Sequence, residues 1–113
     1  MDRSQAEAYA RWFRCLADAT RLQLLRTLAQ ATGPMTVGQL VDVVDVGQSS
    51  VSGHVRRLAE SEFVHVERAG PTTYVTINAE CLAALPDAAD AIMGGLRRGG
   101  PVGALDGSRA SAG

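Results

Sequence analysis

The stretch VGQSSVSGHVRRL, residues 46–58, carries two patterns at once. Val51, Val55 and Leu58 recur at the spacing of one helical face, which predicts contact with a core. The positions between them hold serines, a glutamine, a glycine and two arginines. We therefore expect an amphipathic helix with an apolar side facing the core and an unusually polar side facing outward.

The segments on either side of this helix complete a unit. Before it, Thr36 can cap a short helix over residues 37–44, and residues 45–47 form a tight turn. After it, FVHVER and TYVTI have the composition of strands and predict a β-hairpin joined at residues 69–72, where we expect Pro71 to exclude the tightest turns. These elements predict a winged helix-turn-helix, in which the second helix lies in the DNA major groove and the hairpin, the wing, reaches the neighbouring backbone.

Three further helices are predicted outside this unit, so the chain is expected to be mainly α with a small β-hairpin. The stripe of the first is made of Tyr9, Trp12, Phe13 and Leu16. The second begins after the N-cap Asp18, and its stripe is made of Leu22, Leu25 and Leu28. The last begins at Asn78 and is interrupted by Pro86, and its stripe is made of Leu82, Leu85, Ala89, Ile92, Met93 and Leu96.

Length and composition set the domain organisation. The 113 residues suit one small domain, which we expect over residues 1–96, followed by a disordered tail of glycine, serine and alanine over residues 97–113. A monomer of this size buries only about two-thirds of the surface that its unfolded chain exposes. A partner subunit would therefore help the chain to bury its apolar stripes.

The cysteines and the hydropathy pattern predict the location. Cys15 and Cys81 are too few and too far apart for a disulfide framework, which favours a reducing compartment. No apolar run approaches the ~20 residues of a membrane span, and the sequence shows no signal-peptide pattern at its start. We expect a cytoplasmic protein without a membrane partner.

The polar side of the 46–58 helix has the chemistry of a double-stranded DNA contact. Serine and glutamine suit base edges and phosphates, and arginine reads guanine or neutralises phosphate. Gly53 costs the helix up to ~1 kcal/mol relative to alanine, but in the middle of the outward face it would let the backbone approach DNA. The candidate DNA-binding residues are Gln48, Ser49, Ser50, Ser52, Gly53, Arg56 and Arg57 in the helix, with Arg68 and Thr72 in the wing.

Two alternatives stand beside this interpretation. Serine- and arginine-rich surface helices also occur for solubility, and between residues 48 and 73 three glutamates balance three arginines, so the electrostatic contribution to DNA binding should be modest. A winged-helix module that meets another protein would present a similar helix. An enzyme is not expected, because no catalytic triad, phosphate-binding loop or catalytic metal motif is visible.

Several motifs resemble the ArsR/SmtB family of winged-helix repressors. The most specific are Leu-Ala-Asp-x-Thr-Arg, residues 16–21, and Gln-Ser-x-Val-Ser-x-His, residues 48–54; the similarity runs from about Phe13 to Ile77. The resemblance implies a homodimer joined by its first and last helices, an operator with two-fold symmetry, and transcription regulation by repression that an effector releases. The wing departs from the family, because Pro71 stands where members usually carry an arginine.

The resemblance also limits which kinds of effector site the chain could contain. Two metal sites common in the family are expected to be absent: Thr36, Val37 and Gly38 replace a Cys-x-Cys motif, and the last helix has no histidine. Cys15 and Cys81 remain as a hypothetical sensing site that bridges the dimer and takes a soft metal or metalloid ion, or an oxidant. Cys15 is expected beside two arginines of its helix, which would make it reactive. The alternatives are two small structural residues and a repressor without a metal site.

Overall fold

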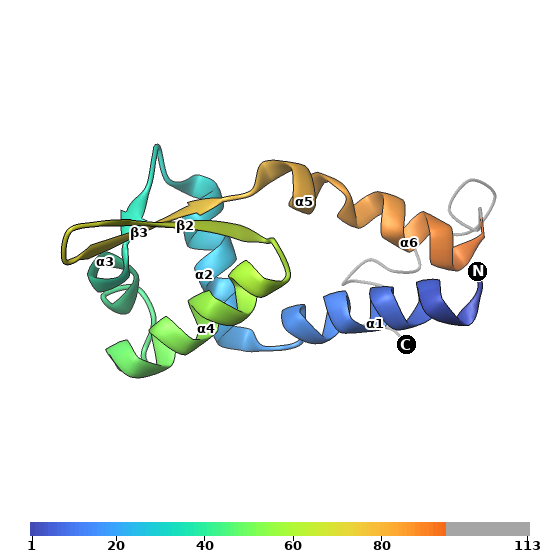
Figure 1. Ribbon diagram of the computed structural model, residues 1–113, viewed down its shortest axis with the longest axis horizontal. Coiled ribbons are helices and arrows are strands. Elements are labelled where there is room, and N and C mark those ends of the chain that lie inside the picture. Colours follow the sequence, from blue (N-terminus) through green and yellow to red (C-terminus); the bar gives the residue numbers. More distant parts are fainter. Residues whose placement is uncertain (95–113) are drawn as a thin grey trace, which may run out of the picture.

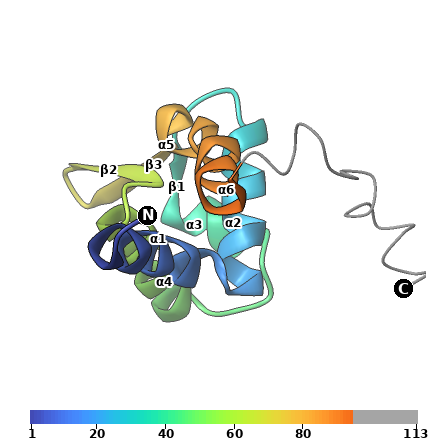
Figure 2. The same cartoon turned by 90° about the vertical axis from the view of Figure 1, so that its right-hand side faces the viewer.

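The computed structural model describes residues 1–94, which form a compact head from which two helices project (Figure 1). In chain order the elements are α1 (Arg3–Leu16), α2 (Ala19–Gln30), β1 (Met35–Thr36), α3 (Val37–Val41), α4 (Gln48–Glu60), β2 (Val64–Ala69), β3 (Thr72–Ile77), α5 (Ala79–Ala83) and α6 (Leu85–Met93). The head contains α2, α3, α4 and the sheet. Figure 2 looks along α1 and α6, with both helices in front of the head.

Local capping chemistry begins α2 and α3 where the sequence predicts. The Asp18 side chain accepts a hydrogen bond from the backbone N–H of Arg21 at 3.0 Å. The Thr36 hydroxyl accepts one from the backbone N–H of Gln39, also at 3.0 Å. The Gln39 side chain in turn accepts from the N–H of Thr36, which completes a capping box. The predicted break near Pro86 is also confirmed, because α5 ends at Ala83 and α6 starts at Leu85.

The sheet has one strand more than the hairpin that we predicted. Its order is β1-β3-β2, with every pair antiparallel, and Met35 pairs with Val75 at one edge. A strand of two residues is too short to show a period in the sequence, so only its pairing with β3 defines it.

The hairpin turn corrects a second expectation. Ala69 pairs with Thr72, so only Gly70 and Pro71 form the turn, and Pro71 does not exclude the tightest connection. The N–H that closes a two-residue turn belongs to the residue after it, here Thr72, and not to Pro71. Gly70 takes the positive φ of 63° that the first position of such a turn favours.

The core of the head lies between α2, α3, α4 and one face of the sheet. Its largest fully buried side chains are Phe63, Leu24, Leu40, Leu58, Val51 and Val75. The stripe predicted for α2 is partly wrong, because Leu22 is 51% exposed and Leu24 is buried in its place. The buried face of α2 runs through Arg21, Leu24, Leu25 and Leu28. An arginine heads this i, i+3, i+4, i+7 series, so a search for apolar residues alone misplaces the face.

The projecting helices bury less. In α1 the predicted stripe is only half-buried, although Trp12 stacks on Phe63 with ring centroids 5.1 Å apart. In α6 only Ala88 is buried, and Ile92 and Met93 are 45% and 52% exposed. Leu96, the side chain of Leu82 and the expected tail over residues 97–113 lie outside the described part of the chain. No helix within residues 1–94 is long and apolar enough to cross a membrane.

Candidate nucleic-acid interface

The helix α4 separates its two faces as the sequence predicts. Val51, Val55 and Leu58 are buried against the head. Most of the candidate residues on the other side of α4 are exposed: Gln48, Ser49, Ser50, Arg56 and Arg57. The remaining two, Ser52 and Gly53, are half-buried. A continuous polar surface therefore follows α4 from its first residue to its last turn.

Gly53 lies on this surface with free space beside it. Within residues 1–94, no heavy atom other than those of the adjacent residues and the surrounding backbone of α4 lies within 4 Å of the position that a Cβ would take. Packing within the protein therefore does not require a glycine here, although glycine disfavours the helix. A binding partner whose surface comes close to the α4 backbone would explain why this position has no side chain.

The two candidate wing residues lie beside the hairpin turn but on opposite faces. Arg68 pairs with Thr73, and Ala69 pairs with Thr72. Because neighbouring residues of a strand point to opposite faces, Arg68 and Thr72 cannot contact the same ligand surface in the same way. Arg68 is exposed and Thr72 is half-buried.

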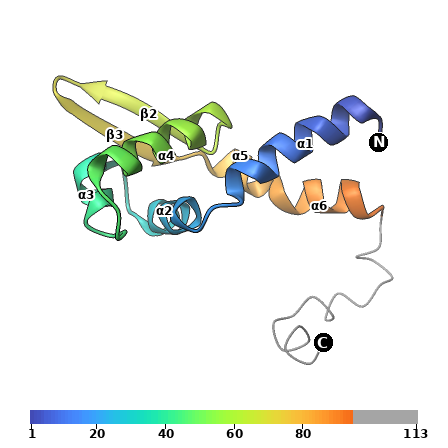
Figure 3. The ribbon, with the colours of Figure 1, turned by 90° about the horizontal axis from the view of Figure 1, so that it is seen from below.

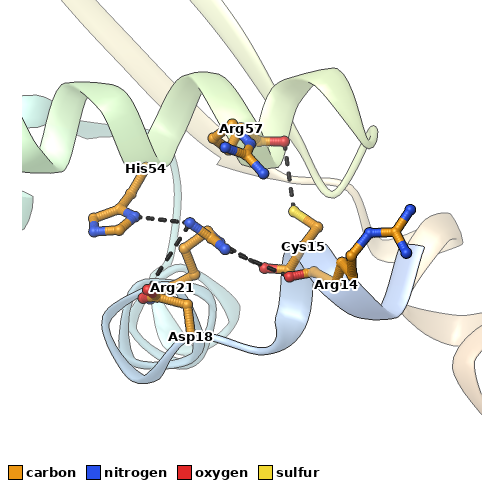
Figure 4. A network of polar contacts seen from close by, with 6 residues as sticks. All are labelled: Arg14, Cys15, Asp18, Arg21, His54 and Arg57. Atoms are coloured by element: carbon orange, nitrogen blue, oxygen red, sulfur yellow. Dashed lines mark hydrogen bonds and ion pairs between the residues drawn. The ribbon is translucent and has the colours of Figure 1, made fainter. Parts of the chain in front are cut away.

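A buried arginine holds α4 in place (Figure 4). Arg21 is only 9% exposed, and its guanidinium donates to the carbonyl oxygens of Cys15 and Arg14 at the end of α1. It also lies 3.1 Å from Nδ1 of His54 on α4. Since a guanidinium has only donors, Nδ1 accepts and the proton of the neutral ring is on Nε2. Arg21 thus joins the end of α1 to the middle of α4 through α2.

Asp18 completes this network from the start of α2. The hydrogen bond from the backbone N–H of Arg21, together with the positive charge of the Arg21 guanidinium, lowers the pKa of the Asp18 carboxyl below its ordinary value, although burial acts in the opposite direction. One Asp18 oxygen also lies 4.0 Å from the Arg21 guanidinium. The motif at residues 16–21 is therefore scaffolding that positions α4, and His54 is a half-buried member of the same network.

The two cysteines meet the same end of α4. The Cys15 thiol donates to the carbonyl oxygen of Arg57 at 3.5 Å, and the Cys81 thiol donates to that of Ser61 at 3.8 Å. Cys15 is 3% exposed, so α4 covers the thiol that we expected to be open and reactive. Cys81 is half-buried. Within residues 1–94 no group of three or more histidine, cysteine, aspartate or glutamate side chains could hold a metal ion.

Comparison with known proteins agrees with this geometry. Residues 18–66 match the profile of a family described as bacterial regulatory protein, arsR family. The arsenical resistance operon repressor of Bacillus subtilis is 31% identical over 83 residues, which cover 71% of this chain and 78% of the repressor. The transcriptional regulator KmtR of Mycobacterium tuberculosis is 38% identical over 68 residues, covering 60% of this chain and about half (51%) of KmtR.

Solved structures are similar over most of the chain. An ArsR-family transcriptional regulator is 26% identical, with a TM-score of 0.67 over 82% of this chain and 90% of the other. A homodimeric winged helix-turn-helix DNA-binding domain from Mycobacterium bovis is 27% identical, with a TM-score of 0.63 over 84% and 88% of the two chains. These relatives are transcriptional regulators and not enzymes. The chain belongs to the ArsR family of bacterial regulatory proteins.

Proposed function

We propose that the protein is a homodimeric transcriptional repressor that binds operator DNA of two-fold symmetry through α4 and the wing. The observation that carries the proposal is the outward face of α4, which is polar along its whole length and has free space at Gly53. A buried network holds this helix to the rest of the head, so its polar side is presented in a fixed position. Such a repressor acts in the cytoplasm, where bacterial DNA lies.

Each candidate residue takes a role that suits its chemistry. Arg56 and Arg57 read guanine or neutralise phosphate, and the hydroxyl and amide groups at the start of α4 contact base edges and phosphates. Gly53 lets the helix backbone come close to the DNA. Arg68 and Thr72 reach the flanking backbone from the two faces of the wing.

The dimer follows from the surface that the projecting helices leave open. Ile92 and Met93 on α6 are about half exposed in the single chain, and the similar domain from Mycobacterium bovis is homodimeric. Two linked copies would place their α4 helices in half-sites about one helical turn, roughly 34–36 Å, apart. This arrangement requires an operator with matching two-fold symmetry.

A gel-shift titration with the DNA upstream of the protein's own gene tests this function. We expect retardation of that fragment at protein concentrations far below those that shift an unrelated fragment of equal length in the same salt. A module that binds another protein would not distinguish the two fragments. Equal or absent binding of both would therefore rule out the proposed repressor and favour the protein-interaction alternative.

A second proposal concerns release from the operator. The specific observation is that both thiols donate to carbonyl groups four residues apart at the end of α4. A soft ion such as mercury(II) would replace both thiol protons, and a peroxide would oxidise the pair to a disulfide while being reduced to water. Either reaction would move the end of the DNA-binding helix. Because Cys15 is buried in its own chain and its thiol contacts Arg57, either reaction must first open the contact between α1 and α4.

The test compares the wild type with Cys15→Ser/Cys81→Ser and with the single variant Cys81→Ser. Operator release is measured after addition of mercury(II), arsenite, cadmium or hydrogen peroxide. We expect release of the wild type by at least one reagent and none of the double variant. Release of all three proteins alike, or of none, would show that the thiols are structural residues.

A further inference from the structure

Three of the exposed arginines of the described chain lie at one junction. The C-terminal halves of α1 and α4 enclose a groove between them, and three of its residues are arginines. Its lining residues are Ala8, Arg11, Trp12, Arg14, Cys15, Arg57, Glu60 and Ser61. Elsewhere in the described part of the chain Arg26, Arg56 and Arg68 are exposed outside this groove, Arg3 pairs with Glu7 at 3.0 Å, and Arg21 is buried in the scaffold.

The groove carries uncompensated positive charge. Three guanidinium groups and one carboxylate line it, a net charge of +2. Within residues 1–94 none of Arg11, Arg14 and Arg57 forms an ion pair, since the two pairs found there involve Arg3 and Arg21. Figure 4 shows the Arg14 guanidinium pointing away from the buried network that its own carbonyl joins. A concentration of one sign of charge in a concave surface attracts an anion.

The groove continues the polar face of α4. Arg57 follows Arg56 on α4 and lies on the flank that turns toward α1. In Figure 3, α1 extends from the C-terminal end of α4 along the same side of the molecule. A ligand that lies along α4 therefore meets Arg11 and Arg14 as it passes the end of that helix.

We infer that this groove binds phosphates of the operator backbone between the two half-sites. The inference rests on the proposed function, because α1 leads from α4 toward the proposed dimer contact, and the DNA that joins the half-sites must cross that region. It also supplies charge that the head lacks, since glutamates balance arginines between residues 48 and 73. Arginine suits this role because its planar fork can hold a phosphate through two hydrogen bonds.

The experiment measures how operator affinity depends on salt for the full chain. Each phosphate contact contributes about 0.9 to the slope of log K against log salt concentration. Arg11→Gln/Arg14→Gln removes two cations from each subunit and therefore should lower the slope by about 2 to 4 units for the dimer. The control is Arg26→Gln, which removes an exposed cation from α2 outside the groove and should leave the slope unchanged. Sedimentation verifies that each variant remains a folded dimer.

The outcomes separate this inference from the function on which it rests. Ethylation of phosphates between the half-sites should also interfere with wild-type binding and no longer affect the double variant. If the wild type selects its own upstream DNA but the double variant keeps the full slope, the groove does not hold DNA, although the repressor function stands. If inorganic phosphate raises the melting temperature of the wild type alone and the slopes are equal, the groove holds a small anion and the inference is overturned. If the wild type does not select that DNA, both proposals fail.

Discussion

The head and the projecting helices differ in how much of their apolar surface they bury within one chain. The head buries a continuous core beneath α4 and satisfies the carbonyl groups at the end of α1 with Arg21. The projecting helices keep their stripes half-buried, and Ile92 and Met93 remain open. The head is thus complete in one chain and can fix the orientation of α4. By contrast, α1 and α6 have apolar surface that a second copy of the chain would cover. Stability and assembly should therefore respond to different substitutions.

The largest effect is expected from Ile92→Glu on α6. A charge in the open stripe should prevent dimerisation, and operator affinity should fall at least 100-fold because two linked α4 helices are needed for two half-sites. Ala91→Glu is the control, since Ala91 is exposed about 100° around α6 from Ile92 and outside the apolar stripe. Sedimentation and gel shifts measure the two effects. Tight operator binding by a monomeric variant would contradict the distinction between head and projecting helices.

The head should be most sensitive at Arg21. Arg21→Met leaves the carbonyl groups of Arg14 and Cys15 and the Nδ1 of His54 without their partner, so the free energy of unfolding should fall by about 2–4 kcal/mol. Arg26→Met on the exposed side of the same helix should change it by less than about 0.5 kcal/mol. Urea denaturation measures both. Equal effects of the two substitutions would show that the buried network does not support the head.

Arg56→Ala should separate binding from stability. Operator affinity should fall by roughly 1–3 kcal/mol if Arg56 contacts a base through two hydrogen bonds, or the salt slope should fall by about one if it contacts phosphate. The free energy of unfolding should stay nearly constant, because the side chain is exposed. Titrations at several salt concentrations decide between the two contacts. A variant with wild-type affinity and slope would exclude Arg56 from the interface.

The smallest effect is expected from Asp18→Asn. Asparagine keeps an acceptor for the N–H of Arg21, so the loss of stability at pH 7 should be less than about 1 kcal/mol. The pKa of Asp18 is lowered in the folded state, so its contribution is present above the unfolded pKa and disappears as pH falls through the folded pKa. Unfolding curves from pH 6 to pH 2 should therefore decline less in the variant. Identical curves for the two proteins would show that the charge of Asp18 does not contribute to stability.

The sequence predicts those features whose causes are local. The period of Val51, Val55 and Leu58 and the caps at Asp18 and Thr36 depend on neighbouring residues, and all of them are found. The strand β1, the burial of Leu24 in place of Leu22 and the covered thiol of Cys15 depend on distant elements that pack against them. The burial of Arg21 depends on distant elements in the same way. A helical pattern that admits an arginine at the first position of the series 21, 24, 25 and 28 would have predicted it.

The central claim is that DNA lies against the outward face of α4, and Gly53→Ala tests it most directly. In the free protein the new methyl group has open space, and alanine favours the helix by up to about 1 kcal/mol, so stability to urea should rise. Against DNA the methyl group should force the helix away, and affinity for the upstream fragment should fall about tenfold or more. Increased stability with weakened binding is the predicted result. Increased stability with unchanged or tighter binding would contradict the claim that this face of α4 meets the operator.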